Sequence, residues 1–230
     1  MLQELQTTSR REQAKGGRRA RIVDATYALL REVGISDLSV KMIADQAGVS
    51  PATVYNLFGT KAAVLEKVYE RDLAAFEKKV ADAPSADALD RIFDSLKIVA
   101  ELYRSDPRFY RSVVSMPNTN PADTELIGAV TRPRVAFTAD MVRAAIEEGH
   151  LRPDTDPVRV GAVMRHISNG ALRSWVSNLI TVDQLEQETI YGVAAILWPF
   201  AVKATQQRLQ KTLDAVASDS TVKRARAAAR

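Results

Sequence analysis

Residues 38–61, LSVKMIADQAGVSPATVYNLFGTK, constrain the fold more than any other part of this chain. Ser39 can cap a helix whose apolar residues recur every three or four positions, so that one face of the helix turns toward a core. Gly48 can supply the left-handed conformation that ends this helix, and Ser50 followed by Pro51 can begin the next one. The segment therefore predicts two short helices joined by a tight glycine turn.

The second of these helices has an uncharged outer surface that fits the major groove of DNA. Val54 and Phe58 point inward, which leaves small and polar residues on the leading and outer sides. Thr53 can touch a thymine methyl group, and Tyr55 and Asn56 can reach base edges or phosphates. If these residues stood alone, an ordinary pair of helices packed at a steep angle would be the alternative to a DNA-binding unit. An apolar stripe upstream supplies the third helix that a DNA-binding unit needs, and it favours the DNA-binding interpretation.

Residues 22–61 resemble the N-terminal DNA-binding domain of the TetR family of bacterial regulators. The resemblance rests on IVDATYALLREVG, IADQAGVS, TVYNLF and the lysine at position 61, which come in the family's order. It implies that phosphates are contacted by Ser39, Tyr55 and Lys61. It also implies that bases are contacted by Pro51, Ala52, Thr53 and Asn56. The whole predicted set of DNA-contacting residues is Ser39, Lys41, Ser50, Pro51, Ala52, Thr53, Tyr55, Asn56 and Lys61.

The resemblance also implies the organisation of the whole chain. The expected fold is all-α, with an N-terminal three-helix helix-turn-helix domain (18–62) joined to a larger helical domain for ligand binding and dimerisation (63–210). A run of basic residues precedes or opens the first helix, namely Arg10, Arg11, Lys15, Arg18, Arg19 and Arg21. It predicts that residues 1–17 form a flexible basic arm that attracts phosphates or enters a minor groove, or else a solubilising end. Residues 211–230 form a second basic end, for which a disordered tail is expected.

The middle of the chain carries aromatic residues and methionines at helical spacing. The resemblance implies a pocket between these helices, where such side chains can bind a small apolar or amphipathic effector. A packed core is the alternative, because methionine readily fills irregular gaps. The predicted pocket residues are Phe93, Tyr103, Phe109, Tyr110, Val113, Met116, Phe137, Met141, Met164 and Ile167.

Two further helical patterns, residues 158–179 and the residues that follow Thr181, carry apolar stripes. These stripes can fill the interior of one subunit or the interface between two. The resemblance implies an interface, because family members typically pair their last two helices into a four-helix bundle. A twofold protein would present two DNA-binding domains to a near-palindromic operator. The predicted interface residues are Val160, Val163, Trp175, Val193, Leu197 and Phe200.

The composition excludes several other kinds of site. The sequence has no cysteine, so disulfides, thiolate zinc sites and cysteine nucleophiles are excluded. His150 and His166 are too isolated to indicate a metal or catalytic cluster, and no cofactor is expected. No apolar run is long enough to span a membrane and no secretory signal is recognisable, so a cytoplasmic location is expected. The formal net charge of +4 does not by itself distinguish a DNA-binding protein from other proteins.

Together these observations predict a homodimeric transcriptional repressor that binds double-stranded operator DNA and releases it when a small-molecule effector binds. A DNA-binding activator without an inducer is one alternative, because it would share the same DNA-binding domain. A helical enzyme or ligand carrier that retains the fold is another. It is disfavoured because no paired carboxylates, nucleophile with a base, or phosphate loop is recognisable in the chain.

Overall fold

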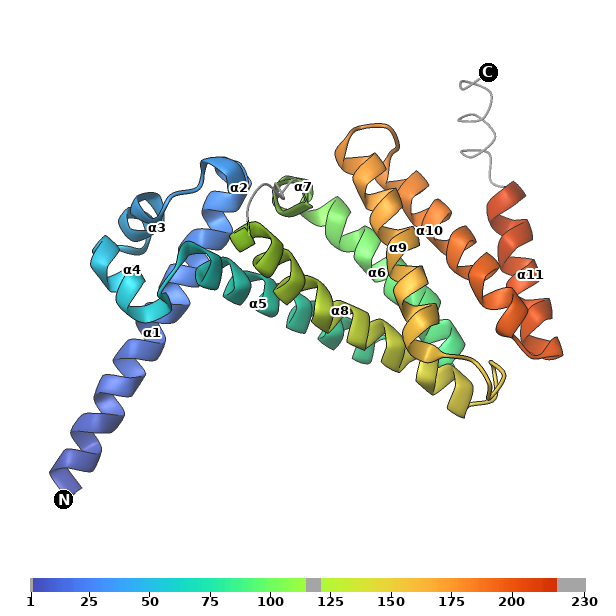
Figure 1. The fold of residues 1–230 in the computed structure, drawn as a ribbon, viewed down its shortest axis with the longest axis horizontal. Helices are drawn as coiled ribbons and strands as arrows, with labels where there is room; N and C mark the ends of the chain where they lie inside the picture. Colours follow the sequence, from blue (N-terminus) through green and yellow to red (C-terminus); the bar gives the residue numbers. More distant parts are fainter. Residues whose placement is uncertain (1, 115–120, 219–230) are drawn as a thin grey trace. The chain divides into compact units, whose positions relative to one another are not determined.

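The structure is a computed structural model of the 230-residue chain, and it describes residues 2–114 and 121–218. Figure 1 shows that these residues form helices joined by turns and short loops. Their one extended pairing is an isolated antiparallel bridge between Leu151 and Ala201. The predicted all-α fold is therefore confirmed. Within the described ranges, no helix combines the length and the apolar character needed to span a membrane.

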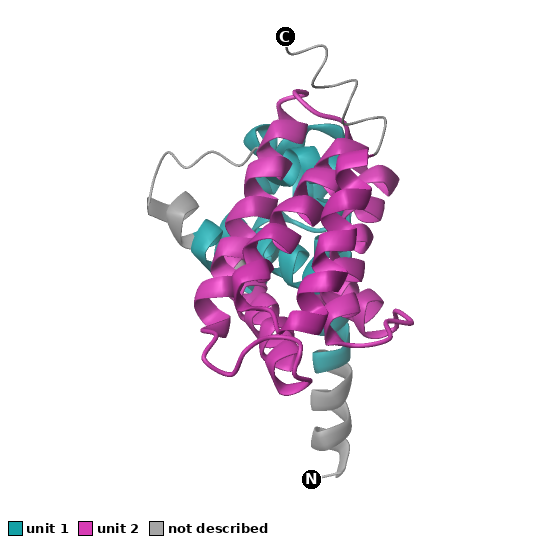
Figure 2. Cartoon of the chain, turned by 90° about the vertical axis from the view of Figure 1, so that its right-hand side faces the viewer, with its two compact units in different colours: residues 1–73, 108–130 teal, residues 74–107, 131–230 magenta. Residues whose placement is uncertain are grey.

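The chain divides into two compact units, which Figure 2 distinguishes by colour. Unit 1 comprises residues 1–73 and 108–130. Its helices are α1 (Leu2–Glu32), α2 (Gly34–Asp37), α3 (Val40–Ala47), α4 (Pro51–Phe58), the first part of α5 (Lys61–Ala81), nearly all of α7 (Pro107–Val114) and the start of α8 (Pro121–Glu147). The core of the helix-turn-helix part is made by buried aliphatic side chains on α1, α3, α4 and α5, namely Ile22, Leu30, Ile43, Val54 and Val64.

Unit 1 is larger than the DNA-binding domain that the sequence predicted over residues 18–62. At its N-terminal end, α1 begins at Leu2, so the residues predicted as a flexible arm are helical. They contain no proline and are mostly good helix formers, which favours continuation of the helix. Unit 1 also includes most of α7, where Phe109 is fully buried and stacks on Tyr27 of α1 with ring centres 4.2 Å apart.

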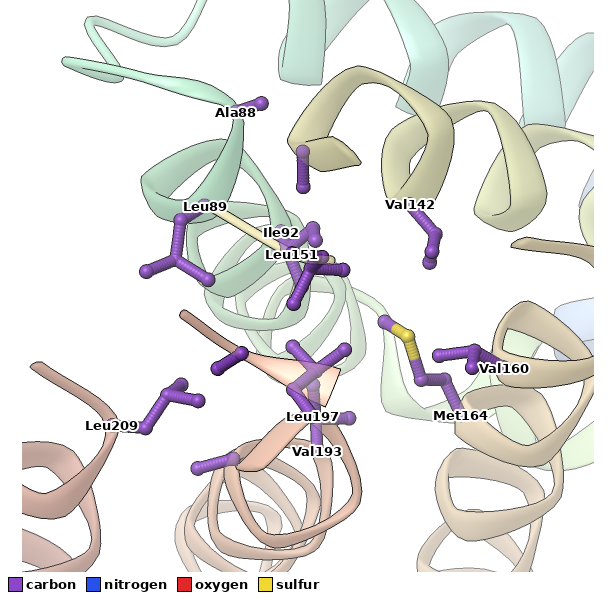
Figure 3. Packing of buried hydrophobic residues seen from close by; sticks show 13 residues of the cluster. Ala88, Leu89, Ile92, Val142, Leu151, Val160, Met164, Val193, Leu197 and Leu209 are labelled. Atoms are coloured by element: carbon purple, nitrogen blue, oxygen red, sulfur yellow. The ribbon is translucent and has the colours of Figure 1, made fainter. Parts of the chain in front are cut away.

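Unit 2 comprises residues 74–107 and 131–230. Its helices are the rest of α5 and α8, α6 (Ala88–Ser105), α9 (Pro157–Val176), α10 (Val182–Leu197), a 3₁₀ turn η1 (Trp198–Phe200) and α11 (Lys203–Ser218). Apolar side chains from α6, α8, α9, α10 and α11 meet in one buried cluster, part of which Figure 3 shows. Ile92, Val142, Val193, Leu197 and Leu209 within it have no solvent exposure.

The C-terminal helix α11 corrects the expectation of a disordered tail that begins at residue 211. The helix continues to Ser218, and Leu213, which lies beyond residue 211, packs against the core cluster in which Leu209 is buried. Arg208 of the same helix forms ion pairs with Asp87 and Asp90 of unit 2. Residues 219–230 of the predicted tail lie outside the described residues.

Candidate nucleic-acid interface

The turn between α3 and α4 has the caps that the sequence predicted. Ser39 accepts a hydrogen bond from the backbone N–H of Met42 at 3.2 Å, which satisfies one of the unpaired amides at the start of α3. At the other end, Gly48 has φ +65°, and the N–H of Val49 donates to the carbonyl of Ala44 at 3.0 Å. The left-handed residue reverses the chain within the turn, as a glycine can do without steric cost.

The start of α4 is fixed in the same local way. The Ser50 hydroxyl accepts a hydrogen bond from the backbone N–H of Thr53 at 3.2 Å, and the two hydroxyl oxygens are 2.9 Å apart. Pro51 occupies the first turn, where its missing N–H costs no helical bond. Val54, only 1% exposed, anchors the inner side of the helix in the core of unit 1.

The outer side of α4 is open to solvent. Tyr55 is 53% exposed, and Pro51, Ala52 and Asn56 are also exposed, whereas Thr53 is half-buried. Because the helix PATVYNLF has no charged side chain, no acidic group on it repels a phosphate backbone. The predicted base-contacting residues therefore lie together on one accessible surface.

The residues predicted to contact phosphates have additional roles within unit 1. Lys61 donates a hydrogen bond from Nζ to the carbonyl oxygen of Leu38 at 2.9 Å, so its ammonium group ties the start of α5 to the loop before α3. An ammonium group has three N–H donors, which leaves two for a phosphate. Ser39 acts as an acceptor in its cap and keeps its hydroxyl proton as a donor. Lys41, in the first turn of α3, is exposed.

Arg19 is a supporting residue that the sequence analysis did not single out from the basic run. Its Nη2 donates to the carbonyl oxygen of Leu57 at 3.0 Å, and its guanidinium carbon lies 5.8 Å from the centre of the Phe58 ring. Both contacts hold the C-terminal end of α4 against α1. The sequence showed Arg19 only as a basic residue on the first helix, because a helical pattern does not show which carbonyl of another helix a side chain reaches.

The predicted pocket residues are divided between the two units. Phe109, Tyr110 and Val113 belong to unit 1, where Tyr110 donates a hydrogen bond to Asp72 at 2.8 Å. Met116 lies outside the described residues. The remaining predicted pocket residues belong to unit 2, and these are Phe93, Tyr103, Phe137, Met141, Met164 and Ile167.

Several of the unit 2 residues have defined packing partners. The Tyr103 ring stacks on Trp175 with centres 5.3 Å apart, and Phe137 meets Phe76 edge-on at 5.5 Å. Met164 is 2% exposed and is part of the core cluster in Figure 3. These contacts agree with the packed-core alternative for these side chains, and a role in ligand binding stays a prediction.

The predicted dimer interface needs correction, because most of its residues are buried inside a single chain. Val160, Val193 and Leu197 belong to the core cluster, and Trp175 is 4% exposed beneath Tyr103. Side chains that are buried in one subunit have no surface to offer to a second one. Phe200 also packs against this core, and Val163 is half-buried.

The described residues do not include a group of three or more histidine, aspartate or glutamate side chains placed to hold a metal ion. The candidate site is the uncharged, exposed surface of α4, together with the capped turn before it and the basic side chains of unit 1.

Comparison with known proteins finds a family match over the part of the chain that contains α3 and α4. Residues 22–68 match the family model of the bacterial regulatory proteins of the tetR family. The chain is 28% identical over 94 residues to the HTH-type transcriptional repressor KstR of Rhodococcus jostii, a match that covers 41% of this chain and 44% of that protein. It is 23% identical over 166 residues to the HTH-type transcriptional regulator UidR of Escherichia coli, which covers 67% of this chain and 79% of that protein.

Solved structures of the same fold extend beyond the N-terminal unit. Thermus thermophilus FadR, a TetR family transcriptional repressor solved in complex with lauroyl-CoA, superposes with a TM-score of 0.65 at 21% identity, covering 80% of this chain and 96% of that one. A TetR-family regulator from Syntrophomonas wolfei gives a TM-score of 0.68 at 15% identity and covers 79% of this chain and 95% of that one. We conclude that residues 22–68 match the DNA-binding domain of the tetR family of bacterial regulatory proteins and that most of the chain shares the fold of TetR-family regulators.

Proposed function

We propose that this chain is a ligand-responsive repressor, which binds a near-palindromic operator as a homodimer and leaves it when a small apolar or amphipathic effector binds. The observation that carries the proposal is the outer surface of α4, with Tyr55 53% exposed on a helix free of charged side chains. The same helix is held in place at both ends, by Ser50 at its start and by Arg19 at its finish. A recognition helix that is fixed in this way can enter a major groove without further ordering.

The electrostatic part of the proposed interface comes from basic residues of α1 and α3. Arg18, Arg19 and Arg21 are exposed on α1, and Lys41 is exposed on α3. They belong to the same compact unit as α4. Contacts between such side chains and phosphates add affinity that does not depend on sequence and that weakens as salt rises.

For the homodimer, the exposed sides of α9 and α10 replace the buried residues that were first predicted. These helices pack against each other in unit 2. Their solvent side includes His166 and Gly170 on α9 and Tyr191, 44% exposed, and Ala195 on α10. Small residues beside a large aromatic one allow two helix pairs to approach closely. A Tyr191→Arg substitution should therefore favour monomers in sedimentation, whereas Val158→Arg, at an exposed residue on the first turn of α9, should not.

The effector part of the proposal rests on the shared fold. FadR of Thermus thermophilus was solved with lauroyl-CoA, which is a molecule with a long apolar chain. In this chain, a ligand that releases DNA must bind the DNA-free state more tightly than the DNA-bound state. The ligand-binding side chains proposed here are the unit 2 members of the predicted set, of which Phe93, Tyr103 and Phe137 are the largest.

The direct test is a fluorescence anisotropy titration of the full chain on DNA from upstream of its own transcription unit, at several salt concentrations. We expect specific binding, and the logarithm of its association constant should fall linearly with the logarithm of the salt concentration. Thr53→Ala should weaken the specific complex by roughly fivefold or more, since a good base contact is worth about 1–3 kcal/mol. Tyr55→Ala should also weaken the complex, because it removes the predicted phosphate contact from the same helix. Ser36→Ala, at an exposed serine of α2, is the matched control and should bind normally.

Two outcomes would count against this function. Absence of specific, salt-sensitive binding would contradict regulation at the DNA upstream of the protein's own transcription unit. Normal binding by both α4 variants would show that another surface of the protein contacts the bases. An activator without an inducer would bind in the same way. Transcription measured with and without candidate effectors separates it from the repressor, because only a repressor should raise expression when it leaves the DNA.

A further inference from the structure

Arg165 on α9 is a cation placed inside unit 2 without a counter-ion. Its Nε is shut off from solvent and has no hydrogen-bond partner, although the residue as a whole keeps a little exposure. Its Nη2 donates to the side-chain oxygen of Asn169, one turn along the helix, at 3.1 Å. None of the ion pairs formed by the described residues includes Arg165. Among the residues that the structure describes, the side-chain acceptor of this guanidinium is therefore a neutral amide.

The position of Arg165 follows from the packing of α9 on α8. One turn before it, Gly161 approaches α8 so closely that an added Cβ would lie 2.9 Å from the backbone nitrogen of Ala139. Residues four apart share a helix face, so Arg165 also lies on the side of α9 that faces α8. Its electrostatic neighbours are Arg134 of α8 and Tyr103 of α6.

The electrostatics around Arg165 are unfavourable for a positive charge. Burial is the main reason that the pKa of Arg165 lies below its usual range, and the like charge of Arg134 acts in the same direction. The Tyr103 hydroxyl opposes this shift. Guanidinium groups stay protonated in proteins, so the charge remains and its cost persists until an anion offsets it.

Tyr103, an electrostatic neighbour of Arg165, belongs to a pair of stacked aromatic rings. Tyr103 is stacked on Trp175 with ring centres 5.3 Å apart and planes 8° from parallel. A guanidinium presents a planar fork of N–H donors that matches the two oxygens of a carboxylate. The flat apolar surface of the stacked rings would favour the uncharged part of the same molecule.

We propose that Arg165 binds the anionic head of the effector, and that this effector is a small organic acid with an apolar body. The proposal rests on the ligand-responsive function proposed above and names the chemical class of the ligand. A carboxylate that enters unit 2 supplies the acceptor that Nε of Arg165 lacks and offsets the charge of this guanidinium. Neutral molecules of the same shape leave that charge unpaired and bind weakly.

The test is isothermal titration calorimetry of the full chain without DNA. The probes are octanoate, decanoate and phenylacetate, each paired with its neutral amide, and hexyl phosphate and inorganic phosphate test for the other common oxyanion. We expect saturable binding of at least one carboxylate and at least tenfold weaker binding of its amide. Arg165→Gln should weaken carboxylate binding at least tenfold, whereas Arg173→Gln, at an exposed arginine of the same helix, should not.

A second measurement separates a ligand-binding arginine from a structural one. Without ligand, Arg165→Gln should unfold at the same temperature as the unaltered chain or higher, because the substitution removes an uncompensated charge. A structural role predicts a lower unfolding temperature. If the glutamine variant does not fold, Arg165→Lys keeps the charge but lacks the fork, and it should still lose affinity for the carboxylate.

Several outcomes of the titration would contradict the role proposed for Arg165. If no carboxylate in the panel binds saturably, if the amides bind as well as the acids, or if Arg165→Gln binds normally, the proposal is overturned. Preference for hexyl phosphate over every carboxylate would overturn the carboxylate assignment. Because the titration contains no DNA, its failure is distinct from failure of the operator titration. When both succeed, the same carboxylate should release operator DNA from the unaltered chain and not from Arg165→Gln.

Discussion

Lys61 donates a hydrogen bond from its Nζ to the carbonyl oxygen of Leu38, 2.9 Å away and twenty-three residues earlier in the chain. The bond joins the first residue of α5 to the segment that leads into α3. A lysine predicted to contact a phosphate is therefore also a structural link within the DNA-binding unit, and the two roles can be separated by measurement.

Replacing Lys61 by methionine keeps an unbranched side chain and removes the charge. A hydrogen bond from a charged donor contributes about 1.5–3 kcal/mol, so Lys61→Met should lower the free energy of unfolding by an amount of that order. If the ammonium group contacts a phosphate, the substitution should also make the slope of the logarithm of the operator association constant against the logarithm of salt concentration shallower by about one.

Lys67→Met is the matched control on the same helix. Lys67 is 53% exposed and pairs with Glu70, so its loss should change stability by no more than about 1 kcal/mol. Urea unfolding and anisotropy at several salt concentrations measure the two effects. A Lys61→Met chain as stable as the control, with an unchanged salt slope, would show that neither role holds.

Gly48 is the residue whose conformation makes the turn possible. Its φ of +65° costs other residues about 1–2 kcal/mol, so Gly48→Ala should destabilise unit 1 by that amount and weaken operator binding. Gly16→Ala is the control, because an added Cβ there meets nothing within 4 Å and a helix gains about 0.5–1 kcal/mol from the change. Thermal unfolding that places the two variants in the opposite order would contradict the left-handed turn.

The elements that could be predicted from the sequence are those fixed by near neighbours. The caps at Ser39 and Ser50 and the turn at Gly48 each depend on residues within five positions, and the structure confirms all three. The family resemblance added the order of the helices around them. Local chemistry and the shared pattern together were enough to place the surface of α4.

The features that were missed depend on contacts between distant residues. An apolar stripe indicates that Val193 and Leu197 are buried, but it does not show whether the covering surface is the same chain or a second copy. The assignment of Phe109 to unit 1 depends on stacking against Tyr27, which no local pattern encodes. Similarly, α11 is held by Leu209 and by Arg208, whose partners lie on α6 and the residue before it.

The contact between Gly161 and α8 predicts a local effect of added volume. A Cβ at Gly161 would lie 2.9 Å from the nitrogen and 3.1 Å from the Cα of Ala139, and neither backbone atom can rotate away. Gly161→Ala should therefore destabilise unit 2 by about 1–3 kcal/mol, as overpacked cores generally do. Gly17→Ala, on α1 with nothing within 4 Å, should be neutral or stabilising by up to about 1 kcal/mol. Equal unfolding free energies for the two variants would mean that α9 and α8 do not pack this closely.

Asp87 predicts how the attachment of α11 depends on pH. Burial alone would raise the pKa of Asp87, but hydrogen bonds from Arg208 and from the backbone of Asp90, together with the charges of Arg208 and His150, bring the pKa below the ordinary 3.8. A carboxyl group whose pKa is lower in the folded chain stabilises the fold above its unfolded pKa. That contribution is lost as the pH falls through the folded value, because protonation removes the charge that Arg208 binds.

Comparison of the unaltered chain with Arg208→Gln isolates this contribution, because His150 is present in both and cancels. At pH 7 the variant should unfold more easily by about 1 kcal/mol, a modest amount because the Arg208 side chain is 39% exposed. The difference should shrink as the pH is lowered below about 4, where Asp87 begins to be protonated in the unfolded chain. Urea unfolding at fixed protein concentration from pH 7 down to pH 3 measures it. A difference that stays constant across this range would show that the Arg208 contact does not depend on the Asp87 charge.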